Sequence, residues 1–356
     1  MIPHDGRNRR TVNFLKTVCF DRPEWTPCSV FFLPATWMKY REDLEALCLE
    51  HRRVFPGFHK GGRDFDALGN PSYEEGRVTD AWGCVWENHQ RGLAGAPVTA
   101  PLADWAALDS YEPPDPLTQD VFGPRRPWDA AAKDLAAARA RGDLAAAGLE
   151  HGFTYMRLYY LRGFDNFMMD LGLGEPRLER LIRMVEDHNA AVIRKFLDAG
   201  AEHLYFGDDL GLQRSLPMSP AMWRRYIKPS YGRLFSLCRE KDAIVYLHSD
   251  GHILPIIPDL METGVQVLNP QIRANGLEGL QRIARGKVCL DQDLDRQLFP
   301  FATPTQVEDH VGEVFEGLYR PEGGLMLLAE CGPDVPLENI HALCRAFERL
   351  CNLPDA

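Results

Sequence analysis

The stretch Ile244-Val245-Tyr246-Leu247-His248-Ser249-Asp250-Gly251 decides the fold that this sequence predicts. Its first four residues are apolar or aromatic on both faces, which is typical of a strand in a parallel sheet that helices cover. The next three residues are polar, and a glycine follows them. This change marks the point where the strand ends and a loop begins.

The same pattern recurs along the chain, because longer helical patterns separate further short apolar runs. Ser219-Pro220 and Thr303-Pro304 each place a hydroxyl at a helix N-cap and proline in the first turn, and Gln306 completes a capping box with Thr303. Together with 244–247, the predicted strands are 28–33, 153–161, 204–206, 265–268, 288–290 and 325–328. With an eighth strand expected upstream, these βα units predict a (β/α)8 TIM-type barrel that forms a single domain over residues 1–356.

Residues 56–128 have a different character. They are rich in Gly, Pro, Asp and Trp and show no sustained periodicity, so we expect an irregular insertion that folds as a lid over the barrel mouth. After this segment, the alanine-rich run 129–149 predicts a helix by intrinsic propensity.

Composition and charge narrow the class of protein. The 356 residues are 45% hydrophobic and 26% charged, as in ordinary globular proteins, and no stretch of 18 apolar residues is present. The net charge of -11 argues against a broad nucleic-acid-binding surface. The first residues lack the apolar core of a signal peptide, so a cytoplasmic location is expected. The nine cysteines form no CxxC pair, which predicts buried free thiols and no disulfide framework or zinc ribbon.

Polar residues follow five successive predicted strands. In a TIM-type barrel the carboxyl ends of the strands meet at one mouth, where the active site lies. We therefore expect these side chains to converge on a site that binds a metal or moves protons. They are Asp208 and Asp209, His248 and Asp250, Asn269, Asp291, and Glu330 with Cys331.

Several segments, taken in order, carry a resemblance to a known family. They are DAWGCVW (80–86), LRGFDNFMMDL (161–171), GDDLGLQ (207–213), YLHSDG (246–251), GVQVLNPQ (264–271) and GPDVPLENI (332–340). With them the chain resembles the uroporphyrinogen decarboxylase superfamily, which includes methyltransferases that exchange methyl groups with corrinoid proteins. The resemblance implies a barrel, a homodimer and a site in the mouth. The arginine-rich motif of the true decarboxylases has no counterpart between Arg22 and Tyr40, so the chain resembles the methyltransferases more than the decarboxylases.

Those methyltransferases bind zinc through a His-x-Cys pair and a cysteine at the last strand. Carried onto this chain, the resemblance implies zinc at His248, Asp250 and Cys331, with Asp250 where relatives have cysteine. Strand alternation lets only one of Glu330 and Cys331 face inward; we favour Cys331 and keep Glu330 as the substitute ligand. The chain has no DxHxxG-type cobalamin signature, so a partner protein would carry the corrinoid.

The leading hypothesis is therefore zinc-assisted methyl transfer between a small methylated substrate and a corrinoid protein. The residues expected to be catalytic are His248, Asp208 and Asp291, and those expected to bind substrate are Trp86, Arg162, Asp209, Gln213 and Asn269.

Two other functions remain open on the sequence. The first is a metal-free decarboxylase or related lyase, in which His248 protonates the product and Arg162 or Arg214 holds a carboxylate. The second is a binding protein without chemistry. In that case His248 is only hydrogen-bonded, Asp250 is a turn residue and Cys331 is an inert thiol. The substrate itself is not encoded in any motif of the chain.

Overall fold

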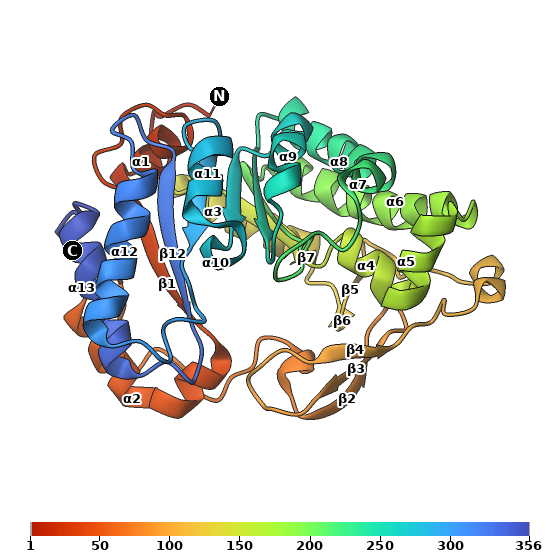
Figure 1. Cartoon of the computed structure of the whole chain (residues 1–356), viewed down its shortest axis with the longest axis horizontal. Coiled ribbons are helices and arrows are strands. Elements are labelled where there is room, and N and C mark those ends of the chain that lie inside the picture. The colour runs from red at the N-terminus through yellow and green to blue at the C-terminus, as the bar shows by residue number, and fades with distance from the viewer. Residues whose placement is uncertain (1, 356) are drawn as a thin grey trace.

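A curled sheet of seven parallel strands with flanking helices forms the centre of the protein (Figure 1), and this TIM-type α/β arrangement confirms the predicted fold class. The computed structural model describes residues 2–355. In spatial order the strands are β1 (Cys28–Phe32), β12 (Leu325–Cys331), β11 (Cys289–Asp293), β10 (Val267–Pro270), β9 (Ile244–Ser249), β8 (His203–Gly207) and β7 (Ala146–His151).

The sheet differs from the predicted barrel at one side. Within residues 2–355 it has seven strands, and β1 and β7 are its edges, so the expected eighth strand is not among them. The predicted strand 153–161 is also wrong, because helix α4 begins at Tyr155. The strand of this unit is β7, which overlaps the end of the predicted helix 129–149. The observed helix ends at Ala140, after which the chain turns through Gly142 with φ 78°.

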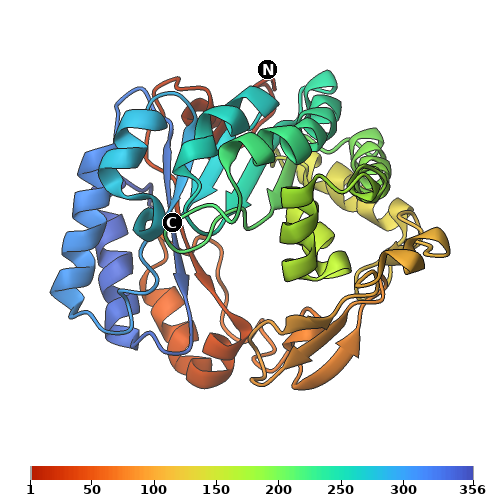
Figure 2. The same ribbon diagram turned by 45° about the vertical axis from the view of Figure 1, so that its right-hand side comes forward.

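Helices cover the outer face of the sheet, as the turned view shows (Figure 2). Ser219 Oγ accepts the Met222 N–H, and the Thr303 and Gln306 bonds form the complete capping box, so both predicted helix starts are confirmed. The helices are α1 (Arg9–Val18), α2 (Pro34–Glu50), α3 (Trp128–Ala140), α4 (Tyr155–Arg162), α5 (Phe164–Leu173), α6 (Arg177–Asp198), α7 (Pro220–Tyr226), α8 (Lys228–Glu240), α9 (Ile257–Thr263), α10 (Ile272–Asn275), α11 (Leu277–Ile283), α12 (Pro304–Leu318) and α13 (Leu337–Leu350). Short 3-10 turns lie at Pro71–Tyr73, Trp105–Asp109 and Leu254–Ile256.

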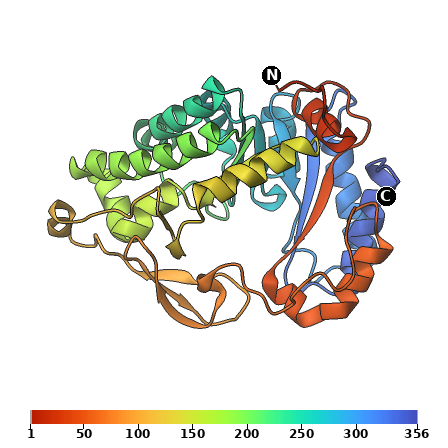
Figure 3. The same cartoon turned by 180° about the vertical axis from the view of Figure 1, so that it is seen from behind.

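Helix α1 closes the amino-terminal end of the barrel. Leu15 and Val18 belong to one buried cluster with residues from alternate positions of the strands, among them Ile244, Tyr246 and Met326. Successive side chains of a strand point to opposite faces, so this cluster identifies the inward face of each strand. The same alternation along β9, from Ile244 and Tyr246 onward, places the His248 side chain inward. Seen from behind, α3 runs toward this end of the molecule (Figure 3), where Asn8 donates to the Arg141 carbonyl.

The segment between α2 and α3 lies at the opposite end, where the strands finish (Figure 1). It is not irregular throughout: β2 (Gly76–Thr79), β3 (Val85–Asn88) and β4 (Ala96–Thr99) form an antiparallel sheet, and β5 (Gln119–Asp120) pairs with β6 (Gly123–Pro124). The short strands explain why no periodicity is visible in the sequence. Asp80 of this insertion forms a buried ion pair with Arg157 of α4 at 2.9 Å, which attaches the insertion to the barrel.

Two further expectations concern the whole chain. The cysteines of the described residues are all free thiols, and most of them are buried, as predicted. No helix among residues 2–355 is both long and apolar enough to cross a membrane.

Candidate active site

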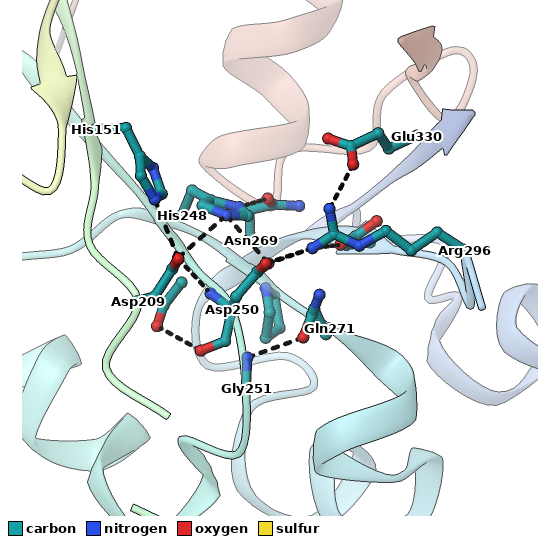
Figure 4. A network of polar contacts seen from close by, with 12 residues as sticks. His151, Asp209, His248, Asp250, Gly251, Asn269, Gln271, Arg296 and Glu330 are labelled. Carbon is teal, nitrogen blue, oxygen red and sulfur yellow. Dashed lines mark hydrogen bonds and ion pairs between the residues drawn. The ribbon is translucent and has the colours of Figure 1, made fainter. Parts of the chain in front are cut away.

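His248 points into the barrel mouth and is held by an asparagine (Figure 4). Its Nδ1 lies 2.5 Å from Oδ1 of Asn269, and Nδ2 of the same amide donates to the Asp291 carbonyl. Because the amide oxygen can only accept, Nδ1 of His248 carries a proton. The second nitrogen, Nε2, therefore points away from Asn269 toward two carboxylates.

Those carboxylates belong to Asp209 and Asp250. Nε2 of His248 lies 3.2 Å from Oδ1 of Asp250 and 3.7 Å from Oδ1 of Asp209. Although burial opposes a charged imidazole, Asp250, Asp209 and the Asn269 contact together raise the pKa of His248 to about 9. The two acidic neighbours thus favour the protonated form of His248, and a metal ion at Nε2 would take the place of that proton.

A second histidine, His151, completes the group from the end of β7. Its Nε2 lies 3.2 Å from Oδ2 of Asp209, and its ring lies 5.5 Å from that of His248. Burial opposes its charge, but the ion pair with Asp209 raises the pKa of His151 above its usual range. Ligand atoms of His151, Asp209 and His248 all lie within 4.8 Å of one another, a grouping suited to a metal ion. Sequence reasoning missed His151 because its strand was assigned to a helix.

Arg296, which follows β11, balances the remaining acidic residues. Its guanidinium contacts both Asp250 and Glu330 at 2.5 Å and lies 3.7 Å from Asp293 (Figure 4). Burial raises the pKa of Asp293 to about 7, against the attraction of Arg296. The single arginine thus explains how three acidic side chains approach one another inside the mouth.

The assignment of Cys331 as the inward residue of β12 is corrected here. Met326 lies in the interior cluster, so the two-residue period places Glu330 inward and Cys331 outward. Cys331 is fully buried in the main hydrophobic core, and burial raises the pKa of its thiol. Glu330 is accordingly the residue of this pair that lines the mouth.

Asp208 is also placed differently from the prediction, since it faces outward from the end of β8. Its carboxylate accepts the backbone N–H groups of Tyr155 and Met156 at 2.6 and 2.8 Å and the Tyr231 hydroxyl at 2.7 Å. Burial raises its pKa to about 6. Asp208 therefore caps the start of α4, and its carboxylate oxygens are engaged away from the mouth.

Arg162 is not available to hold a substrate. It is buried, pairs with Asp170 at 2.7 Å and donates to the carbonyls of Leu102 and Ala103. Trp86 lies on β3, where its indole donates to Asp80 at 3.0 Å. Both residues serve the packing of the insertion against the barrel.

Asp291 lies inside the barrel on β11, which β10 separates from the strand of His248. Its carboxylate accepts the Tyr246 hydroxyl at 2.8 Å, and burial raises its pKa to about 6. Its carbonyl accepts from Asn269, so the residue supports the orientation of His248. Asn269 itself positions the histidine, which differs from its predicted contact with substrate.

An open cavity of about 840 Å³ adjoins the His248 group. This volume is sufficient for a small organic molecule. The polar residues of its wall include Asp209, Gln213, Asp250, Gln271, Arg296 and Glu330. Gln213 and Asp209, two of the predicted substrate-binding residues, are therefore at this cavity. Gln271 also accepts the Gly251 N–H at 2.8 Å, which fixes the loop after β9 (Figure 4).

Comparison with known proteins relates this chain to a family. A methyltransferase from Methanosarcina mazei has a similar solved structure, with a TM-score of 0.59 and 18% identity over 95% of this chain and 98% of that one. D-psicose 3-epimerase from Clostridium cellulolyticum H10 has a TM-score of 0.38 and 9% identity, covering 63% of this chain and 83% of its own. No curated protein sequence matches the chain. The profile of the uroporphyrinogen decarboxylase (URO-D) family matches residues 80–350, and the chain therefore belongs to this family.

Proposed function

We propose that the protein is a methyltransferase that moves a methyl group between a small methylated substrate, of the methyl ether or thiol type, and a corrinoid protein. Zn²⁺ bound by His151, Asp209 and His248 would assist the transfer. The observation that carries this proposal is the grouping of these three side chains beside an open cavity at the barrel mouth. The similar fold of the Methanosarcina mazei methyltransferase supports it.

The donor atoms fit zinc. Two imidazole nitrogens and a carboxylate oxygen, with a further position open to substrate, form a common pattern of catalytic zinc sites. The bond from His248 Nδ1 to Asn269 directs Nε2 toward Asp209 and Asp250, as outer partners of metal-binding histidines do. A bound Zn²⁺ would polarise a methyl ether oxygen or hold a thiol as thiolate.

The other residues of the mouth have defined tasks in this proposal. Arg296 holds Asp250 and Glu330, whereas Asp209 directs one carboxylate oxygen at each of the two histidines. Gln213 and Gln271 offer amide groups to a polar substrate in the cavity. The insertion 56–128 would act as the lid, and the corrinoid would be carried by a partner protein that docks at the mouth of a homodimeric enzyme.

The proposal is tested by metal analysis together with methyl transfer. The variants His151→Gln and Asp209→Asn are expected to lose one equivalent of zinc relative to the unaltered protein. They should also lose methyl transfer from methyl ethers and methyl thioethers to cob(I)alamin. Cys331→Ala and His89→Gln are the controls, since Cys331 is in the core and the His89 side chain is 86% exposed; both should keep zinc and activity.

A different outcome would favour the second candidate, a metal-free decarboxylase. Its designated carboxylate anchor Arg162 is paired with Asp170, but Arg273 and Arg296 line the cavity. Release of CO₂ from a small carboxylated substrate by zinc-free protein, unchanged in His151→Gln, would refute methyl transfer with zinc.

A further inference from the structure

A second group of possible metal ligands lies outside the barrel mouth, between helices α2 and α13. It consists of Glu50 and His51 at the end of α2 and His341 on α13, whose ligand atoms lie within 4.8 Å of one another. The His51 side chain is only 5% exposed, whereas that of His341 is 29% exposed. The group is therefore half-enclosed, and solvent reaches one side of it.

The hydrogen bonds of His51 fix which nitrogen is available. Its Nδ1 lies 3.1 Å from a carboxylate oxygen of Glu348, which can only accept, so Nδ1 carries the proton. Its Nε2 then presents a lone pair, and it lies 2.9 Å from Nδ1 of His341. A carboxylate that orients the far nitrogen of a histidine is the usual outer partner of a metal-binding imidazole.

The charged residues around the group are compatible with a bound cation. Arg345 is bound by Glu308 at 3.0 Å. Glu50 lies 4.0 Å from His341 Nδ1 and is largely exposed, so it is free to move onto an ion.

We infer that Glu50, His51 and His341 bind a divalent transition metal ion of the zinc type, which joins α2 to α13. Two imidazoles and one carboxylate select Zn²⁺, Co²⁺, Ni²⁺ or Cu²⁺ over Mg²⁺ and Ca²⁺, which prefer oxygen ligands. Helix α2 follows β1, an edge of the seven-stranded sheet, and α13 follows its neighbour β12. The ion would join the helices of the first and last βα units, next to the edge strand β1.

The test isolates this site in the His151→Gln variant, which lacks the proposed catalytic ligand. Added Zn²⁺ is expected to raise its melting temperature, and Mg²⁺ is not. Added Co²⁺ should produce the visible absorption of an imidazole-bound ion. Replacing the outer carboxylate, Glu348→Gln, should weaken Zn²⁺ binding by about 10–100-fold.

The decisive comparison is the double variant His151→Gln/His341→Gln, matched by His151→Gln/His89→Gln as control. The stabilisation by Zn²⁺ should vanish in the first and persist in the second. Equal stabilisation in both, or none in His151→Gln itself, would overturn the inference. His341 is partly exposed, so its replacement tests the site without removing the buried His51. Because the readout is stability in a protein without the catalytic ligand, the result does not depend on methyl transfer.

Discussion

The buried ion pair between Asp80 and Arg157 offers the sharpest test of how the insertion is attached. The side chains are 0% and 2% exposed, respectively, and their charged atoms lie 2.9 Å apart. Asp80 also accepts the Cys84 N–H at 2.8 Å and the Trp86 indole N–H at 3.0 Å. The variant Asp80→Asn keeps one oxygen acceptor and turns an amide N–H₂ toward the donors that the second oxygen had served.

The expected cost follows from the burial of the charge that remains. Removing one partner of a buried ion pair destabilises a protein by about 3–5 kcal/mol, because the other charge stays buried without compensation. Glu150 lies 3.3 Å from Arg157 and continues to pair with it. Burial raises the pKa of Glu150 to about 7, so it is a weaker partner than Asp80 at neutral pH. We therefore expect Asp80→Asn to lower the free energy of unfolding by about 3 kcal/mol, near the lower end of this range.

Urea unfolding followed by tryptophan fluorescence measures this loss, and limited proteolysis shows whether the insertion detaches first. The matched control is Asp66→Asn, which breaks the Asp66–Arg41 pair at 3.1 Å, where both side chains are about half exposed. Exposed pairs contribute about 0–1 kcal/mol, so the control should change little. Equal losses for Asp80→Asn and Asp66→Asn would refute the reasoning. The double variant Asp80→Asn/Arg157→Met should lose less than the sum of its single variants.

Three further predictions concern other parts of the fold. Burial lowers the pKa of His188 to about 4, so as the pH falls below 6.5 this histidine takes up a proton in the unfolded chain before it does so in the folded protein. The free energy of unfolding should therefore be about 2 kcal/mol lower at pH 5 than at pH 7 because of His188. His188→Phe should remove that part of the pH dependence in urea unfolding, and an unchanged slope would contradict it. Ser219→Ala should cost about 1 kcal/mol in the same assay by removing the N-cap of α7. Arg162→Met should cost about 3 kcal/mol because Asp170 is left buried and unpaired, yet zinc content should stay unchanged; loss of zinc would place Arg162 in the site.

The strands that the sequence predicted are those whose apolar runs suit a covered parallel sheet. β7 escaped prediction because Ala146, Ala147 and Gly148 have low strand propensity and continue an alanine-rich helical pattern. This segment is a strand because it pairs with β8 in the folded protein. A Cβ atom at Gly148 would lie 3.0 Å from the Tyr205 carbonyl oxygen, so glycine allows the close approach of the two backbones. Missing β7 also meant missing His151, which is one of the three proposed zinc ligands.

The choice between adjacent polar residues at a strand end depends on one physical rule, the two-residue period. In the parallel register Phe31 pairs with Glu330 and Phe32 with Cys331, and Phe32 is buried in the outer core. The sequence alone indicates this alternation but not which residue of a strand faces inward, because the two neighbouring residues at each strand end are both polar or small. Gly207 pairs with the inward His248, so the same count turns Asp208 outward to cap α4. Once a single inward residue is known for each strand, the period selects Glu330 for the mouth and removes Cys331 from the set of possible ligands.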